Sequence, residues 1–456
     1  MKKITVYLLI ITLICMMGIP VFAGLSNPTI GINVLLNQEV TKDILSDLQS
    51  HGKVQNIIYE INAVTMKIKS DELINIRSLP FVVSANPDAA RNGAPIDTIS
   101  AENMLDGAGT WNLDAINVTE PGFNNRQVDY DGSGVYIAVL DTGLLDSWRQ
   151  YFPEERIAEE YAISFGGGGG ETGTVSTQPN KWQHDQNSHG THVTSTILGY
   201  SMYGNPVNGV APMATIIPVK VLNQNGSGWS SVIAAGITYV ADLKAGPLAD
   251  YPVIINMSLG GPSLDALEQA AIDYAISKGV IIVASAGNEG EAGMGYPGAY
   301  EPVISVAASG WTGEWVSGSS WWNAADVTDP TDVTEFYITD FSSREHEGQD
   351  LDVAAPGSWI VGPYQVNSGQ ISYYFLGGTS MASPHVAGIV ALMAEKQPAM
   401  TAAEAEAYLE DSAIPMDAGT RSILTGPGGV FYDIEWGTDA TGAGLVDAAA
   451  ALDMIP

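Results

Sequence analysis

Short runs of apolar residues without polar alternation recur along the chain after about residue 130, and helical segments lie between them. Such runs are typical of strands that are covered on both faces, as in a parallel sheet. The predicted strands are Val135–Leu140, Ile216–Val221, Val253–Met257, Val280–Ser285 and Val303–Ala307. Helices are predicted over Ser230–Lys244 and Leu264–Lys278. This order predicts an α/β fold with a doubly wound, mostly parallel sheet.

A different pattern occupies residues 30–87, where two short helices are interspersed among four strand-like segments. The strands are predicted at Ile30–Leu36, Val54–Glu60, Ala63–Ile68 and Phe81–Ala85, and the helices at Thr41–His51 and Asp71–Leu79. The resulting order, β-α-β-β-α-β, predicts a small α+β domain of the ferredoxin-like kind.

Three further segments lack the periodicity of helices or strands. Residues 88–110 are rich in Asn, Gly, Pro, Asp and Ala, and we expect an exposed linker there. The five glycines at 166–170 predict a flexible surface loop. The stretch 311–340, rich in Trp, Asp, Thr and Ser, is interpreted as a long insertion in the large domain.

The first 23 residues have the pattern of a secretory signal peptide. Lys2 and Lys3 precede an apolar stretch, and Ala23 supplies a small residue at the expected cleavage position. An uncleaved N-terminal anchor is the alternative. No later apolar run is long enough to cross a membrane. Cys15, the one cysteine, lies in the leader. We therefore expect a secreted mature chain without disulfides and without a membrane segment.

The chain is strongly acidic, and this charge limits the classes of partner that it can bind. Its 456 residues carry 51 Asp and Glu against 18 Lys and Arg, a net charge of −33. Binding of nucleic acids or of anionic membrane surfaces requires basic patches, so both are excluded as expected partners. With 45% hydrophobic residues, the chain can still bury a large core.

Four polar residues stand where strands end or helices begin, which is where α/β folds place their sites. Asp141 ends a predicted strand, and His189 begins an apolar helical run. Ser380 follows two glycines at the start of another helix, so that its backbone amide is free to stabilise an oxyanion. Asn288 follows another predicted strand and has glycines on both sides, and its side-chain amide is a second candidate oxyanion donor.

A metal site is the alternative interpretation of the histidines. His184, His189 and His192 cluster in the sequence, but their intervals of five and three residues fit a helical ligand set poorly. His192 lies inside an apolar run and is interpreted as a buried structural histidine.

Together these motifs closely resemble those of the subtilisin-like serine proteases, the subtilases. The motifs are Val-Leu-Asp141-Thr-Gly, His189-Gly-Thr-His-Val, Ser285-Ala-Gly-Asn288-Glu-Gly and Gly-Thr-Ser380-Met-Ala-Ser-Pro-His. The resemblance covers residues 111–456 and implies a serine endopeptidase acting on polypeptides. It implies that Ser380 is the nucleophile, His189 the general base and acid, Asp141 the carboxylate that orients the imidazole, and Asn288 an oxyanion-hole donor.

The resemblance also implies a set of substrate-binding residues. Two strands would hold the substrate backbone between them, and glycines would leave a wide S1 pocket for large apolar P1 side chains. The strands contain Gly226, Ser227 and Gly228 on one side and Ser258, Leu259 and Gly260 on the other; Ser285, Ala286, Gly287 and Gly295 would line S1.

Residues 24–87 resemble the family's propeptide, an inhibitor-like domain that acts as an intramolecular chaperone. The resemblance implies an autoprocessed zymogen that is cut within the 88–110 linker, with Met104 or Leu105 as P1, and a monomeric mature domain over 111–456. Calcium is expected as a structural ion because the surface is acidic, at sites that the sequence does not identify. The loop that helps form a tight calcium site in many relatives, around Ser201–Val207 here, is short, so that site is not carried over. No cofactor is expected for catalysis.

Two other functions stay open at this stage. A catalytically silent scaffold on the same fold would be expected to have lost one of the four catalytic side chains, and none is missing. A peptidase dedicated to one processing step is the other, although permissive binding strands favour broad specificity.

Overall fold

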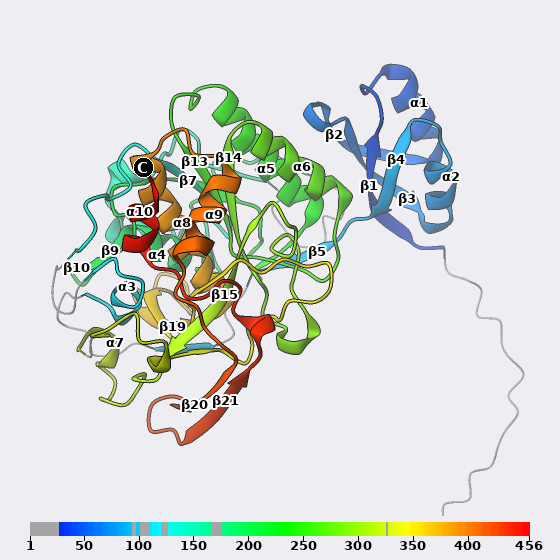
Figure 1. Ribbon diagram of the computed structural model, residues 1–456. Helices are drawn as coiled ribbons and strands as arrows, with labels where there is room; N and C mark the ends of the chain where they lie inside the picture. Colours follow the sequence, from blue (N-terminus) through cyan, green and yellow to red (C-terminus); the bar gives the residue numbers. More distant parts are fainter. Residues whose placement is uncertain (1–26, 94–96, 101–108, 120–125, 166–174, 325–326) are drawn as a thin grey trace, which may run out of the picture.

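The computed structural model describes residues 27–93, 97–100, 109–119, 126–165, 175–324 and 327–456. They form a small N-terminal unit that lies beside helices α5 and α6 of a much larger unit (Figure 1). The predicted leader 1–23 with Cys15, the glycine loop 166–170 and the proposed P1 residues Met104 and Leu105 fall outside the described residues.

The small unit has the predicted β-α-β-β-α-β order. Its elements are β1 (Thr29–Leu36), α1 (Lys42–His51), β2 (Gly52–Ile58), β3 (Ala63–Lys69), α2 (Leu73–Arg77) and β4 (Val82–Pro87). The four strands form one antiparallel sheet in the order β2-β3-β1-β4. Ile32 and Val34 from β1 pack against Ile44 and Leu48 from α1 in a core of its own.

The large unit is built on an eight-stranded sheet in the order β16-β15-β14-β13-β7-β11-β8, with β17 beside β15. All its pairs are parallel except β15 with β16, so the predicted mostly parallel sheet is confirmed. The strands are β7 (Tyr136–Asp141), β8 (Ile163–Ser164), β11 (Thr215–Lys220), β13 (Val253–Met257), β14 (Val280–Ser285), β15 (Ile304–Trp311), β16 (Phe336–Ile338) and β17 (Val353–Pro356).

Helices cover both faces of this sheet, which explains the continuous apolar strands. Ile137 and Val139 of β7 belong to the core that α4 and α8 cover. The alternate residues Ala138 and Leu140 belong to the core under α5 and α6. The helices are α4 (His189–Leu198), α5 (Ser230–Ala245), α6 (Ala266–Ser277), α8 (Thr379–Lys396), α9 (Ala402–Ser412) and α10 (Ala448–Met454).

The expectation of an exposed linker over 88–110 holds for Ala90 and Asn92 but is wrong for several other described residues. Asp88 and Arg91 are buried. Strand β5 (Ala90–Asn92) pairs antiparallel with β12 (Ser227–Trp229), and β6 (Asp97–Ser100) pairs with β19 (Tyr373–Gly377). A lone strand held through its backbone needs no hydrophobic period, so the sequence pattern could not reveal this pairing.

The insertion 311–340 is folded into the core of the large unit. Trp311 and Trp321, the latter on the short helix α7 (Trp321–Ala324), lie 6.4 and 5.8 Å, ring centre to ring centre, from Trp111 of α3 (Trp111–Asp114). Glu314 is fully buried and accepts a hydrogen bond from Tyr337 at 2.8 Å. The insertion therefore covers the N-terminal end of the predicted peptidase domain.

Three hairpins were not predicted from the sequence. They are β9 (Gly199–Met202) with β10 (Asn205–Asn208), β18 (Ile360–Pro363) with β19, and β20 (Gly419–Leu424) with β21 (Phe431–Trp436), which projects from the body of the molecule (Figure 1). In the described part of the chain, no helix combines the length and apolar character needed to cross a bilayer.

Candidate active site

Asp141 is the last residue of β7, which lies between β11 and β13 in the sheet; after β7 the chain forms β8 and β11 on one side and then β13 on the other. Where the chain leaves neighbouring strands toward opposite sides of a sheet, a crevice opens at their carboxyl ends, and ligands bind there. The Asp141 side chain is fully buried, and its Oδ1 accepts a hydrogen bond from Thr142 N at 2.6 Å. Both carboxylate oxygens lie within hydrogen-bond distance of His189 Nδ1, at 2.8 and 2.9 Å.

Glycine at position 190 allows α4 to approach the end of β7 this closely. A Cβ atom on Gly190 would stand 2.5 Å from the carbonyl oxygen of Gly143 and 3.1 Å from Asp141 Cβ. The Gly190 backbone amide donates to Thr142 Oγ1 at 2.9 Å, which fixes the helix start against the strand. The contact between Asp141 and His189 thus requires a residue without a side chain at position 190, which explains the His-Gly pair of the motif.

The surroundings of His189 favour its protonated form. Burial by itself lowers the pKa of the imidazole, but the charge and hydrogen bond of Asp141 outweigh it, with Asp185 adding to the effect, so the pKa is raised. Asp185 is itself buried, and burial raises its pKa to about 6 against the opposing charge of Lys220. His189 Nε2 is buried and has no hydrogen-bond partner among the described residues.

Ser380 is the second residue of α8, where backbone amides have no partner within the helix. Its Oγ donates to the carbonyl oxygen of Ser258 at 3.3 Å, and Ser258 Oγ donates back to the Ser380 carbonyl at 2.8 Å. Asn256 extends this network, because its Oδ1 accepts from Ser383 Oγ at 2.8 Å. The start of α8 is therefore tied to the end of β13.

Asn288 follows β14 and is oriented by the residue before Ser380. Its Oδ1 accepts hydrogen bonds from the backbone amide and the hydroxyl of Thr379, both at 2.9 Å. With Oδ1 so engaged, Nδ2 is the end of the amide left to donate to a ligand. Nδ2 lies 3.7 Å from the point that a Cβ on Gly378 would occupy, beside the first turn of α8.

The predicted substrate-binding strands lie on either side of β5. Gly93 N donates to Gly226 O at 2.8 Å, and Asn92 exchanges two backbone hydrogen bonds of 2.9 Å with Gly260. β12, which contains Ser227 and Gly228, pairs with β5 from one side, and the segment Ser258-Leu259-Gly260 flanks it on the other. A Cβ on Gly93 would stand 3.4 Å from His189 Cε1 and 2.7 Å from Ser258 O.

The residues predicted for S1 adjoin the segment Ser258-Leu259-Gly260. Ser285 Oγ donates to Leu259 O at 3.4 Å, and Gly295 N donates to Ala286 O at 2.8 Å. Gly295 faces Gly260, since a Cβ on Gly260 would lie 3.8 Å from its Cα. Gly287 has a φ of +109°, which only glycine adopts without strain, and its amide donates to Thr379 Oγ1 at 3.2 Å.

The three clustered histidines do not converge on one point. His184 is exposed and pairs with Asp146, whereas His189 pairs with Asp141. His192 is buried against Ile360 O, and burial lowers its pKa to about 3. The structure thus gives each histidine its own partner, and His192 is a neutral core residue as expected.

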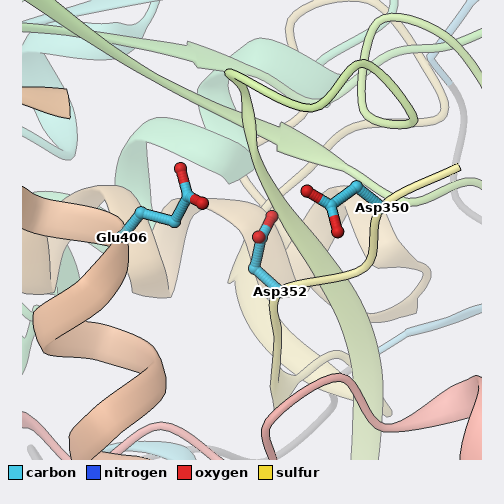
Figure 2. Close-up of side chains that lie close together, drawn as sticks. All are labelled: Asp350, Asp352 and Glu406. Carbon is cyan, nitrogen blue, oxygen red and sulfur yellow. The ribbon is translucent and has the colours of Figure 1, made fainter. Parts of the chain in front are cut away.

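A carboxylate cluster that the sequence interpretation missed lies at the amino ends of β15 and β17, the edge of the sheet opposite the one where Asp141 ends β7. Asp350, Asp352 and Glu406 point toward one another, the first two from the segment before β17 and the third from α9 (Figure 2). Asp352 Oδ2 accepts from the amide and hydroxyl of Ser305 at 2.6 and 2.8 Å. Its Oδ1 is buried and has no partner in the described part of the chain.

The charges of this cluster are poorly compensated by protein. Burial raises the pKa of Asp352 to about 8 and that of Glu406 to about 7, with neighbouring carboxylates adding to both. Oxygen ligands of this kind suit a hard cation such as Ca²⁺. The Asp-Leu-Asp spacing at 350–352 was the one available sequence signal, and it is too common to have been decisive.

A buried carboxylate–imidazole pair, a serine at a helix N-terminus and an oriented amide beside it are the kinds of group that nucleophilic acyl transfer uses. The sequence profile of the Subtilase family matches residues 132–446. The chain belongs to this family and is a serine-type endopeptidase.

Several curated relatives are similar over most of their length. Thermitase of Thermoactinomyces vulgaris is 34% identical over 283 residues, which are 62% of this chain and 82% of the relative. Subtilisin E of Bacillus subtilis is 30% identical over 376 residues, 82% of this chain and 80% of the relative. The thermostable alkaline protease of Halalkalibacterium halodurans is 32% identical over 302 residues, 66% of this chain and 67% of the relative.

Among solved structures, fervidolysin from Fervidobacterium pennivorans matches 94% of this chain with a TM-score of 0.66 and 24% identity, and the match spans 62% of the fervidolysin chain. Sphericase matches 74% of this chain and 97% of its own length, with a TM-score of 0.52 and 30% identity. Both support the same fold.

Proposed function

We propose that this protein is a secreted endopeptidase, made as a zymogen, whose catalytic triad is Asp141, His189 and Ser380. The observation that carries the proposal is the fully buried pair of Asp141 and His189 Nδ1 at 2.8 Å. The pair fixes the imidazole tautomer and leaves Nε2 as the nitrogen that accepts a proton. Ser380 Oγ donates to Ser258 O in this structure, so the proposed mechanism requires that the hydroxyl turn toward His189 Nε2.

In the proposed reaction, Ser380 Oγ attacks the carbonyl carbon of the peptide bond while His189 Nε2 takes its proton. The Ser380 amide and Asn288 Nδ2 stabilise the oxyanion that forms. The His189 proton then passes to the leaving amine, and an acyl-enzyme remains on Ser380. Water, deprotonated by His189, hydrolyses this ester and restores the serine.

Substrates would bind by adding a strand between β12 and the segment Ser258–Gly260. β5 supports this assignment, because it occupies that position with main-chain hydrogen bonds to Gly226 and Gly260. Recognition of the main chain alone gives broad specificity. Gly260 and Gly295, which face each other, favour large apolar side chains at P1. A preference for Gly or Ala in a peptide panel varied at P1 would contradict this.

The N-terminal unit would be the inhibitory propeptide. Strand β5, which follows it, lies between the two substrate-binding strands and ends beside His189, so no substrate can bind while it stays. We place the maturation cut after Gly93 and before Trp111, within the predicted 88–110 region. The released unit keeps β5 and with it the ability to inhibit as a bound product. Secretion is proposed from the leader-like residues 1–23, and the mature 111–456 domain is proposed to be monomeric.

The decisive experiment compares wild type with Ser380→Ala, each expressed as residues 24–456. Intact mass is followed with time, and casein hydrolysis is assayed in parallel. We expect the wild type to release a fragment that ends between residues 94 and 110 and to digest casein. The serine variant should stay full length and inert. If both folded proteins stay full length and inactive, the catalytically silent scaffold is the better description.

The cluster of Asp350, Asp352 and Glu406 is proposed as a structural calcium site. The buried, unpartnered Oδ1 of Asp352 supports this, because burying such an oxygen without a partner is costly. Calcium would raise the thermal midpoint of the inactive Ser380→Ala protein, and Asp352→Asn would remove most of that rise. Glu347→Gln, which removes an exposed charge in the preceding loop, is the matched control. A rise of equal size in all three proteins would show that calcium binds elsewhere.

A further inference from the structure

Strand β5 carries a charged side chain that is wholly enclosed. Arg91 is 0% exposed, and its partner Glu268 on α6 is 1% exposed. Arg91 Nε lies 3.1 and 3.0 Å from the two carboxylate oxygens of Glu268, and Nη2 also donates to Oε2. Nη1 donates to Ala90 O at 2.9 Å. The guanidinium is therefore held as a fork, which is the geometry that arginine forms and lysine does not.

The register of β5 fixes where this side chain stands relative to the reacting atoms. The Cβ position of Gly93 lies 3.4 Å from His189 Cε1, so we take Gly93 as the second residue before the cleaved bond. Side chains alternate along a strand, so Arg91 points to the same side as Gly93, two residues further from the bond. Arg91, opposite Gly228, thus occupies P4 of the substrate path.

The negative charge around Arg91 comes mostly from the large unit. Glu268 and Asp265, the N-cap residue of α6, both belong to it and stay in place when β5 leaves. Burial works against the charge on Arg91, yet Glu268, Asp265 and Asp88 outweigh it and raise the guanidinium pKa. Burial raises the pKa of Glu268, and Arg91 opposes that rise. Among the described residues, no other cation forms an ion pair with Glu268.

We propose that Glu268 makes this pocket a subsite for arginine, so that the enzyme prefers polypeptides with arginine at the fourth residue before the cleaved bond. The proposal rests on the proposed endopeptidase function and on β5 lying as a substrate lies. Removal of β5 takes away the cation that pairs with Glu268, and an incoming guanidinium restores the pair. An apolar P4 side chain leaves Glu268 buried and unpaired, which is costly.

The test uses the mature wild-type enzyme and quenched fluorescent peptides that differ only at P4. The side chains compared are arginine, lysine, leucine and citrulline, the last a neutral group with nearly the shape of arginine. Because a buried ion pair of this kind is worth about 2 kcal/mol or more, we expect kcat/KM for arginine to exceed that for citrulline by about 30-fold or more. Lysine should fall between them, since it cannot form the fork.

Glu268→Gln should bring the arginine and citrulline peptides to within a few-fold of each other. Glu347→Gln removes the same formal charge from an exposed position and should keep the full ratio, which separates the local contact from the acidity of the whole protein. If Glu268→Gln fails to fold, the ratio of arginine to citrulline in the wild type decides alone.

The outcomes separate the two proposals. Equal cleavage of arginine and citrulline peptides, or a preference for leucine, would overturn the arginine subsite while leaving the endopeptidase intact. Absence of hydrolysis of every peptide and of casein would overturn the proposed function, and the subsite with it.

Discussion

Replacing Asp141 by Asn should move the acidic limb of the pH–rate profile to lower pH. His189 acts as a base only when neutral, so activity falls as the pH drops through its pKa. The wild-type pKa lies above the ordinary value of His because the Asp141 carboxylate, fully buried and 2.8 Å away, outweighs burial. Removing that charge removes the cause of the increase, so the pKa must fall.

The size of this shift follows from the contact. A hydrogen bond to a charged group is worth about 1.5–3 kcal/mol, and one pKa unit corresponds to about 1.4 kcal/mol. The acidic limb of kcat/KM should therefore move down by about 1–2 pH units in Asp141→Asn. The plateau should also drop, on the order of 10⁴-fold, because asparagine can donate to Nδ1 and favour the wrong tautomer.

The assay is kcat/KM for one neutral peptide substrate between pH 4 and pH 10, measured on mature protein. Asp185 provides the control, because it acts on His189 through its charge and not through a hydrogen bond. Burial raises the pKa of Asp185 to about 6. Asp185→Asn should move the limb by less than Asp141→Asn, since Asp185 contributes less to the raised pKa of His189. An acidic limb that stays in place in Asp141→Asn but moves in Asp185→Asn would refute the assignment of the limb to the His189–Asp141 pair.

Three further changes test other parts of the site and core. Asn288→Ala should lower kcat by about 10²–10³-fold with little change in KM, because an oxyanion donor acts mainly in the transition state; an unchanged kcat would remove Asn288 from the mechanism. Gly190→Ala should reduce kcat/KM by about 100-fold, since its Cβ would stand 2.5 Å from the Gly143 carbonyl and α4 must shift; wild-type rates would show that the helix adapts freely. Trp321→Ala, at a fully buried position in the tryptophan cluster, should cost about 3–5 kcal/mol in urea unfolding of the Ser380→Ala protein. A loss below 1 kcal/mol would mean that the insertion packs loosely.

Much of the fold could be predicted because its elements are marked locally. The five predicted parallel strands are largely apolar, since both faces are covered, and each was found within four residues of its observed ends. The shorter parallel strands β8 and β17 were not predicted. The start of α1 was also predictable, because the Thr41 hydroxyl accepts from Ile44 N as an N-cap.

The structures of the insertion 311–340 and of the linker 88–110 were harder to predict from the sequence, each for a different reason. Trp311 and Trp321 lie among polar residues, so nothing local shows that they are buried against Trp111, some 200 residues earlier. Burial of β5 depends on the two strands that flank it, and hairpins such as β20–β21 depend on register between segments of weak periodicity.

The sequence by itself determined the residue types of the site and the elements that carry them: an acid after a strand, a histidine and a serine at helix starts, and an amide after another strand. Motif spacing carries this information, because catalytic groups need particular backbone positions. Only the tertiary structure decided that Asp141 and His189 meet in a fully buried contact. It alone placed Arg91 against Glu268 and gathered Asp350, Asp352 and Glu406. These contacts join residues far apart in the chain, and their energies come from burial and charge, which exist only once the chain is folded.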